Sequence, residues 1–176
     1  LGIERKLRRN GVTTAHMVSP TVWAWRSGRI RTIRAAVDHM LVLFPFEEPI
    51  YNAAGIPATF IGHPLADEIP AGLDQAAARE DLRLPQNAPV IAVLPGSRRG
   101  EIERMAPPFI RAARQVLERV PEARFLVPLV TRATRELFEG ILYHEQARDL
   151  PMSLLFGHAQ DALAACDVAL ATSGTV

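Results

Sequence analysis

The residues best suited to chemistry lie in the stretch L-P-G-S-R-R-G-E at positions 94–101, which combines two glycines, a hydroxyl and two guanidiniums. The stretch follows a continuous apolar run at 90–94, typical of a parallel strand covered on both faces. It precedes residues 101–119, whose apolar positions recur at helical spacing. Glycines at such a junction let backbone N–H groups approach an anion, the helix start adds partial positive charge, and Arg98 or Arg99 can form a bidentate contact. The pattern suits a diphosphate.

The same residues also allow a plainer interpretation, in which Gly96 and Ser97 make the turn, Ser97 caps the helix and the arginines are solvated. Taken alone, the turn leaves both interpretations open. A second polar turn, T-S-G-T at 172–175, follows another apolar run at 168–171. Ligands of parallel α/β sheets lie beyond the carboxyl ends of the strands, so the two turns meet in one pocket if these strands are adjacent.

Strand and helix patterns alternate along the whole chain. Strands are expected at 14–18, 39–44, 59–61, 90–94, 124–129, 153–156 and 168–171. Helices are expected at 28–37, 45–51, 74–82, 101–119, 133–145 and 160–165. Residues 65–75 are interpreted as a linker, because Pro and Gly interrupt any periodic pattern there.

Two successive βα series joined by a linker predict two α/β lobes with mostly parallel sheets, at residues 1–64 and 76–176. The chain begins inside a basic helix and stops directly after the second polar turn, where a doubly wound lobe would continue into a helix. We therefore expect a fragment in which both lobes are incomplete.

Composition narrows the class of protein. The chain has 176 residues, of which 48% are hydrophobic, enough for a real core. Its single cysteine, Cys166, lies in an apolar pattern and is interpreted as a core residue of a reduced, cytoplasmic protein. No uncharged run approaches the ~18 residues needed to span a bilayer, so any membrane contact is expected to be peripheral.

Charge is unevenly distributed along the sequence. Residues 1–34 carry eight Lys or Arg against one Glu, whereas the remainder carries twelve basic and eighteen acidic residues. The basic part could face a phosphorylated substrate, anionic lipid or nucleic acid. A solvated helix face is the plainer alternative, and both stay open.

Several common cofactor motifs are missing from the sequence. It contains no G-x-G-x-x-G fingerprint, no G-x-x-x-x-G-K loop, no D-x-D pair and no zinc-type Cys/His spacing. We therefore expect a phosphate site that uses neither a metal nor a cofactor.

Both tryptophans lie in V-S-P-T-V-W-A-W-R at 18–26. Trp23 and Trp25 could line an apolar groove or stack on a sugar ring, or they could anchor the core. His63, between Gly62 and Pro64, is interpreted as a turn histidine rather than a hinge residue.

Five motifs, in this order, resemble the lipid-A-disaccharide synthase family: V-S-P-T-V-W-A-W-R (18–26), L-F-P-F-E (43–47), G-H-P-L-A-D (62–67), L-P-G-S-R-R-G-E (94–101) and A-T-S-G-T (171–175). The resemblance implies a GT-B fold of two Rossmann-like lobes. It implies an inverting, metal-independent transfer of 2,3-diacylglucosamine from its UDP derivative to 2,3-diacylglucosamine 1-phosphate. The products would be the β-1′,6 disaccharide of lipid A synthesis in Gram-negative bacteria, and UDP.

The resemblance also implies a place for each lobe and for the protein. The first lobe would handle the acceptor and acyl chains, and the second would hold the nucleotide. The protein would be cytoplasmic and peripheral on the inner face of the inner membrane, where its basic first lobe meets anionic lipid. The complete protein could form a homodimer, and nucleic acid is not an expected partner.

The family motifs imply roles for particular residues. Arg98, which directly follows Ser97 in the family's G-S-R sequence, would stabilise the departing diphosphate, with Ser97 and backbone N–H groups near Gly96 as further donors. The opposing turn would consist of Thr172, Ser173, Gly174 and Thr175. The acceptor side would include Trp23, Trp25 and Arg26.

The remaining roles fall on Glu101 or outside the sequence. Glu101 is interpreted as a helix-start acid rather than a catalyst. The general base and the residue that binds the nucleotide ribose are expected outside this chain.

Two alternatives remain open. One is another UDP-sugar enzyme of the same fold, such as a polyprenyl-linked glycosyltransferase or a UDP-sugar epimerase. The other is a nucleic-acid-binding α/β module that uses the basic residues 1–34, although no aromatic residues interleave with the early arginines.

Overall fold

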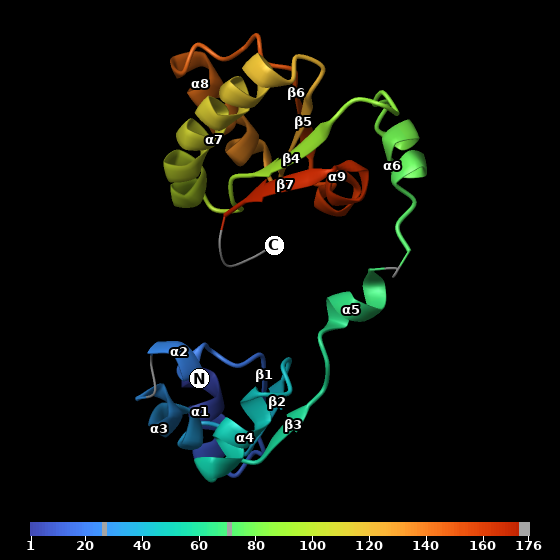
Figure 1. Cartoon of the computed structure of the whole chain (residues 1–176). Coiled ribbons are helices and arrows are strands. Elements are labelled where there is room, and N and C mark those ends of the chain that lie inside the picture. Colours follow the sequence, from blue (N-terminus) through green and yellow to red (C-terminus); the bar gives the residue numbers. More distant parts are fainter. Residues whose placement is uncertain (26–27, 70–71, 173–176) are drawn as a thin grey trace. The chain divides into compact units, whose positions relative to one another are not determined.

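The computed structural model describes residues 1–25, 28–69 and 72–172, and for residues 24 and 25 it describes the backbone alone. The chain divides into two units, Leu1–Ala71 and Gly72–Val176, each built around a parallel sheet (Figure 1). This confirms the α/β class with parallel sheets that the alternating pattern predicted.

The first unit contains a three-stranded sheet in the order β1 (Ala15–Met17), β2 (His39–Val42) and β3 (Ala58–Phe60). Its helices are α1 (Gly2–Arg9), α2 (Val22–Trp25), α3 (Arg29–Arg34), α4 (Glu47–Ala53) and α5 (Pro64–Glu68). The core consists of side chains that the sheet and α3 and α4 bury together, among them Ile33, Met40, Val42, Tyr51 and Ile56.

Two short helices of this unit were not predicted from the sequence. α5 has Pro64 as its first residue and runs through Glu68, into the segment at 65–75 that was interpreted as a linker. Proline is common at the first position of a helix, because the N–H of that residue has no acceptor within the helix in any case. The Nδ1 of His63 accepts the N–H of Leu65 at 3.2 Å and so caps this helix. The other unexpected element is the single turn α2.

The second unit contains a four-stranded parallel sheet in the order β6 (Met152–Phe156), β5 (Arg124–Leu129), β4 (Val90–Leu94) and β7 (Val168–Ala171). Its helices are α6 (Gln75–Asp81), α7 (Arg99–Arg119), α8 (Arg132–His144) and α9 (Ala159–Ala165). β4, β5 and β7 have the bounds that their apolar runs predicted.

Helices cover both faces of this sheet, which explains the continuous apolar runs. On one face α7 and α8 pack against Val93, Phe125 and Val127. On the other face Val90 and Leu126 pack with residues of α6 and α9.

The 21-residue helix α7 continues through Pro107 and Pro108. Proline supplies no N–H to a helix and normally bends or ends it. Burial offsets this cost, because α7 presents an unbroken apolar stripe to the sheet that includes Ile102, Phe109 and Ile110.

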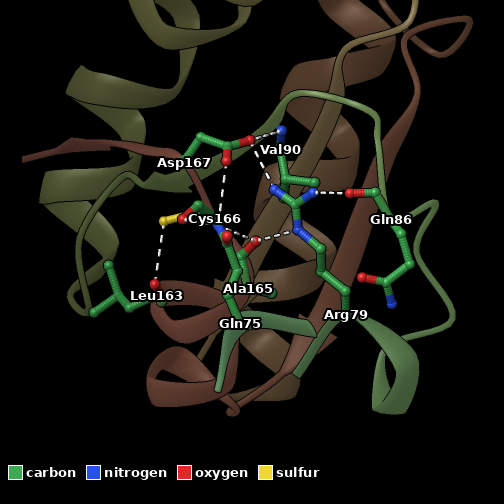
Figure 2. Close-up of polar contacts among 8 residues, drawn as sticks. All are labelled: Gln75, Arg79, Gln86, Val90, Leu163, Ala165, Cys166 and Asp167. Carbon is green, nitrogen blue, oxygen red and sulfur yellow. Dashed lines mark hydrogen bonds and ion pairs between the residues drawn. The ribbon is translucent and has the colours of Figure 1, made fainter. Parts of the chain in front are cut away.

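A buried arginine joins α6 to the amino ends of β4 and β7 (Figure 2). Arg79 is only 5% exposed. Its guanidinium donates to the carbonyls of Ala165 (3.0 Å) and Gln86 (2.5 Å) and to Oδ2 of Asp167 (2.8 Å). The same Oδ2 accepts the N–H of Val90 at 2.8 Å, at the first residue of β4.

We expect Arg79→Met to lower the free energy of unfolding by about 2–4 kcal/mol, because the buried carbonyl of Ala165, the part-buried carbonyl of Gln86 and the half-exposed carboxylate of Asp167 lose their charged donor. Arg135→Met is the matched control. Arg135 forms an exposed i,i+4 pair with Glu139 on α8, so its replacement should change stability by less than about 1 kcal/mol. Chemical denaturation measures both, and equal small changes would contradict a structural role for Arg79.

Asp167 should make part of this stability depend on pH. The N–H of Val90, followed by Gln75 and Arg79, holds the pKa of Asp167 below its ordinary value. A carboxyl whose folded-state pKa is lowered stabilises the fold above its unfolded-state pKa of about 4, and that contribution is lost as pH falls through the folded-state pKa. The free energy of unfolding, measured by chemical denaturation at a series of pH values from neutral to acid, should therefore decrease less for Asp167→Asn than for the wild type.

Candidate functional site

The strands that precede the two polar turns of the sequence end side by side. β4 and β7 are parallel neighbours, with Leu94 opposite Ala171. The N–H of Thr172 donates to the carbonyl of Leu94 at 3.1 Å, so the pairing continues into the start of the second turn. The predicted adjacency of these strands is therefore confirmed, whereas residues 173–175 lie outside the described residues.

A positive φ at Gly96 shapes the first turn. Its φ is +120°, and a Cβ added there would lie 2.5 Å from Cβ and 2.7 Å from Oε2 of Glu101. Glu101 folds back over the turn, where its Oε2 accepts the N–H groups of Ser97 (3.0 Å) and Arg98 (3.1 Å). Only glycine fits beneath this carboxylate.

These contacts favour the ionised form of the Glu101 carboxyl. The two backbone N–H donors, helped by the guanidinium of Arg98, hold the pKa of Glu101 below its usual value. Its interpretation as the acid at the helix start is confirmed. The cap itself differs from the prediction, because Arg98 and not Ser97 occupies the N-cap position before α7.

The two arginines of the turn have different partners. Nη1 of Arg98 lies 3.1 Å from Oε1 of Glu101, beside the turn. Nε of Arg99 lies 2.8 Å from Oε1 of Glu103, one helical turn further along α7. Both arginine side chains are about four-fifths exposed, at 79% and 80%.

The beginning of α7 also offers backbone donors. In residues 72–172 nothing accepts the N–H groups of Arg99 and Gly100. Such first-turn N–H groups have no partner inside the helix and carry the positive end of its dipole. Together with Arg98 they make an edge that can receive an anion.

In the first unit, the residues assigned to the acceptor side are described only in part. The Trp23 side chain is 52% exposed, which contradicts a role as a core anchor. Its ring meets Phe46 edge-on at 5.3 Å, and Phe46 stacks on Phe44 at 5.6 Å. Arg26 and the Trp25 side chain lie outside the described residues.

Cys166 and His63 both make structural contacts, although His63 is a helix cap and not the turn histidine that the sequence predicted. Cys166 packs at the edge of the α6–α9 core, and burial raises the pKa of its thiol. His63 caps α5, as described above.

The described residues contain neither a cluster of metal-binding side chains nor a membrane-spanning helix. No three His, Cys, Asp or Glu side chains gather there to hold a metal ion. None of the described helices is both long enough and apolar enough to cross a membrane.

Solved structures share this architecture. The S. aureus MnaA–UDP co-structure superposes with a TM-score of 0.61 at 9% identity, covering 96% of this chain and 48% of that chain. UDP-GlcNAc 2-epimerase from Neisseria meningitidis bound to UDP-GlcNAc gives 0.62 at 11% identity, covering 96% and 50%. At such low identity the likeness concerns the fold alone, which is the GT-B-like fold of two Rossmann-like parts.

Sequence similarity identifies the family. The profile of the lipid-A-disaccharide synthetase family matches residues 1–176, and the chain belongs to that family. Lipid-A-disaccharide synthases of Chromobacterium violaceum and Dechloromonas aromatica are 54% and 52% identical to it over 99% of its length. The chain spans 45% and 46% of those two relatives.

Sequence reasoning found the turn but missed two features of the site. The contact of Glu101 with the N–H groups of Ser97 and Arg98 was not anticipated, although a glutamate three residues after a helix cap is a known capping signal. The edge-on contact of Trp23 with Phe46 joins segments 23 residues apart in sequence, so no local pattern predicts it.

We expect Gly96→Ala to destabilise the second unit by about 1–3 kcal/mol. The new Cβ would overlap Glu101, and an alanine would be held at a strained positive φ. Gly140→Ala is the control, since nothing lies within 4 Å of a Cβ at that position in α8. That change should stabilise the helix by roughly 0.5–1 kcal/mol. Denaturation of both variants tests the prediction, and a Gly96→Ala variant as stable as the wild type would contradict it.

Proposed function

We propose that the full-length protein transfers 2,3-diacylglucosamine from its UDP derivative to 2,3-diacylglucosamine 1-phosphate, releasing UDP and forming the disaccharide of lipid A. The observation that carries the proposal is the family match along all 176 residues. The pairing of β4 with β7 supports a nucleotide site in the second unit, because it places Thr172 beside Leu94, the last residue before the turn that contains Arg98.

The proposed reaction needs a group that accepts negative charge from the departing UDP. The acceptor hydroxyl forms a bond to C1 of the donor sugar, the bond from C1 to the diphosphate oxygen breaks, and the hydroxyl proton passes to a base outside this chain. Arg98 and the first turn of α7 would stabilise the charge that develops on the diphosphate. Thr172, Ser173, Gly174 and Thr175 would hold it from the opposite side.

Two finer points belong to the same proposal. Transfer is inverting, because a single displacement at C1 reverses its configuration. It is metal-independent, because a guanidinium and a helix start neutralise the diphosphate and the sequence has no D-x-D pair. The acid that binds the ribose would follow the second turn.

The first unit would receive the acceptor at a membrane surface. Eight of its first 34 residues are Lys or Arg, and each basic residue near an anionic surface contributes on the order of 1 kcal/mol. The exposed rings of Trp23, Phe44 and Phe46 support an apolar contact in the same unit. We propose peripheral association with the cytoplasmic face of the inner membrane, with Trp23, Trp25 and Arg26 on the acceptor side.

A substrate panel tests the proposal against the other UDP-sugar enzymes of this fold. The full-length protein should convert acylated UDP-glucosamine and the acylated 1-phosphate to disaccharide, and should leave unacylated UDP-glucosamine unchanged. Epimerisation of an unacylated sugar would instead favour an epimerase. RNA binding without UDP binding, measured at two salt concentrations, would favour a nucleic-acid module.

Within this proposal, Arg98→Ala should lower kcat by roughly 10²–10³-fold, the usual cost of one strong electrostatic donor. Arg99→Ala serves as the control, because Glu103 holds that guanidinium one turn along α7, and its kcat should stay within about threefold of wild type. Steady-state kinetics of the full-length variants measure both. Near-normal turnover of Arg98→Ala would remove Arg98 from the mechanism.

A further inference from the structure

Glu101 satisfies three donors of the first turn at once. One carboxylate oxygen accepts two consecutive backbone N–H groups, those of Ser97 and Arg98, and the other accepts Nη1 of Arg98. The glutamate is 27% exposed although it lies at the start of a surface helix. Gly96 lies beneath it with no room for a side chain. Turn, arginine and glutamate therefore form one closed unit.

The neighbouring ion pair shows what is particular about this arrangement. Arg99 and Glu103 are also joined by a hydrogen bond on α7, and Arg99 is as exposed as Arg98. Glu103, however, is 46% exposed and holds Arg99 along the helix, away from the turn. The two pairs differ in direction, and only the pair of Arg98 with Glu101 fastens a guanidinium to the turn.

The contact leaves most of Arg98 able to bind something else. A guanidinium has five N–H donors, and Glu101 uses Nη1 alone. In the described part of the chain Arg98 makes its side-chain contact through Nη1, which leaves Nε and Nη2 without a partner there. The N–H groups of Arg99 and Gly100 likewise have no backbone acceptor among these residues. A long arginine side chain that is already held loses less rotamer freedom when a ligand binds.

We propose that Glu101 is the positioning residue of the diphosphate site: it holds the turn and the guanidinium of Arg98 in the arrangement that receives the anion, and it is not itself displaced. This inference rests on the proposed function, because it assigns the diphosphate of UDP to Arg98. The uridine part of the ligand does not enter it. Removal of Glu101 should therefore weaken binding of the diphosphate selectively.

Binding of UDP and of uridine to the full-length protein tests the inference by calorimetry or competition. Glu101→Ala should weaken UDP binding about tenfold, the equivalent of one charged hydrogen bond at its lower limit, and leave uridine binding unchanged. Glu101→Gln keeps an oxygen acceptor for the two N–H groups and loses the charge. It should weaken UDP binding less, by about threefold. Glu103→Ala, the matched control, should bind UDP as the wild type does.

Every other outcome overturns either the proposed function or the role assigned to Glu101. If the wild type binds no UDP, the proposed function fails and this inference fails with it. If the wild type binds UDP and Glu101→Ala binds it equally well or more tightly, the carboxylate is a bystander or a competitor, and only the role of Glu101 is overturned. An equal loss for UDP and uridine overturns it in favour of a general structural role. If Glu101→Ala does not fold, Glu101→Gln decides, and unchanged UDP binding in that variant overturns the inference.

Discussion

The parallel pairing of β4 with β7 is the constraint on which the candidate site depends. Hydrogen bonds bracket it, from the N–H of Asp167 to the carbonyl of Val90 at one end and from the N–H of Thr172 to the carbonyl of Leu94 at the other. Because parallel strands end at the same edge of a sheet, this register determines which loops become neighbours. The strands that precede the two polar turns, which lie about 75 residues apart in sequence, thus end side by side.

Two arginines at opposite ends of these strands show how burial decides what a side chain does. Arg79 is almost wholly buried, and its guanidinium donates hydrogen bonds to two carbonyls and to Asp167, which link α6 to the sheet. Arg98, largely exposed, has a single side-chain partner, Glu101, among the described residues. The N–H donors of a buried guanidinium all need acceptors within the protein. Those of an exposed guanidinium can bind water, which a ligand can later replace. The amino ends of the strands therefore serve stability, and the carboxyl ends can serve binding.

The first turn couples backbone conformation to charge. A carboxylate that folds back over Gly96 needs a residue without Cβ, and the N–H groups that it accepts lie at the beginning of α7. Membership of the lipid-A-disaccharide synthetase family gives this turn a biological setting. The solved UDP-sugar enzymes share only the fold, since their identity to this chain is near 10%.

The sequence by itself determined the α/β class, the bounds of β4, β5 and β7, and the turn that contains Gly96, Ser97 and Arg98. These depend on local signals: continuous apolar runs, helical periodicity and glycine between them. Only the tertiary structure decided the neighbours of β4, the direction of Arg98 and Arg99, and the exposure of Trp23. It also showed a helix that runs from Pro64 through Glu68, into the segment interpreted as a linker. Strand order and side-chain direction depend on hydrogen bonds and packing between segments far apart in the chain, which a local pattern does not encode.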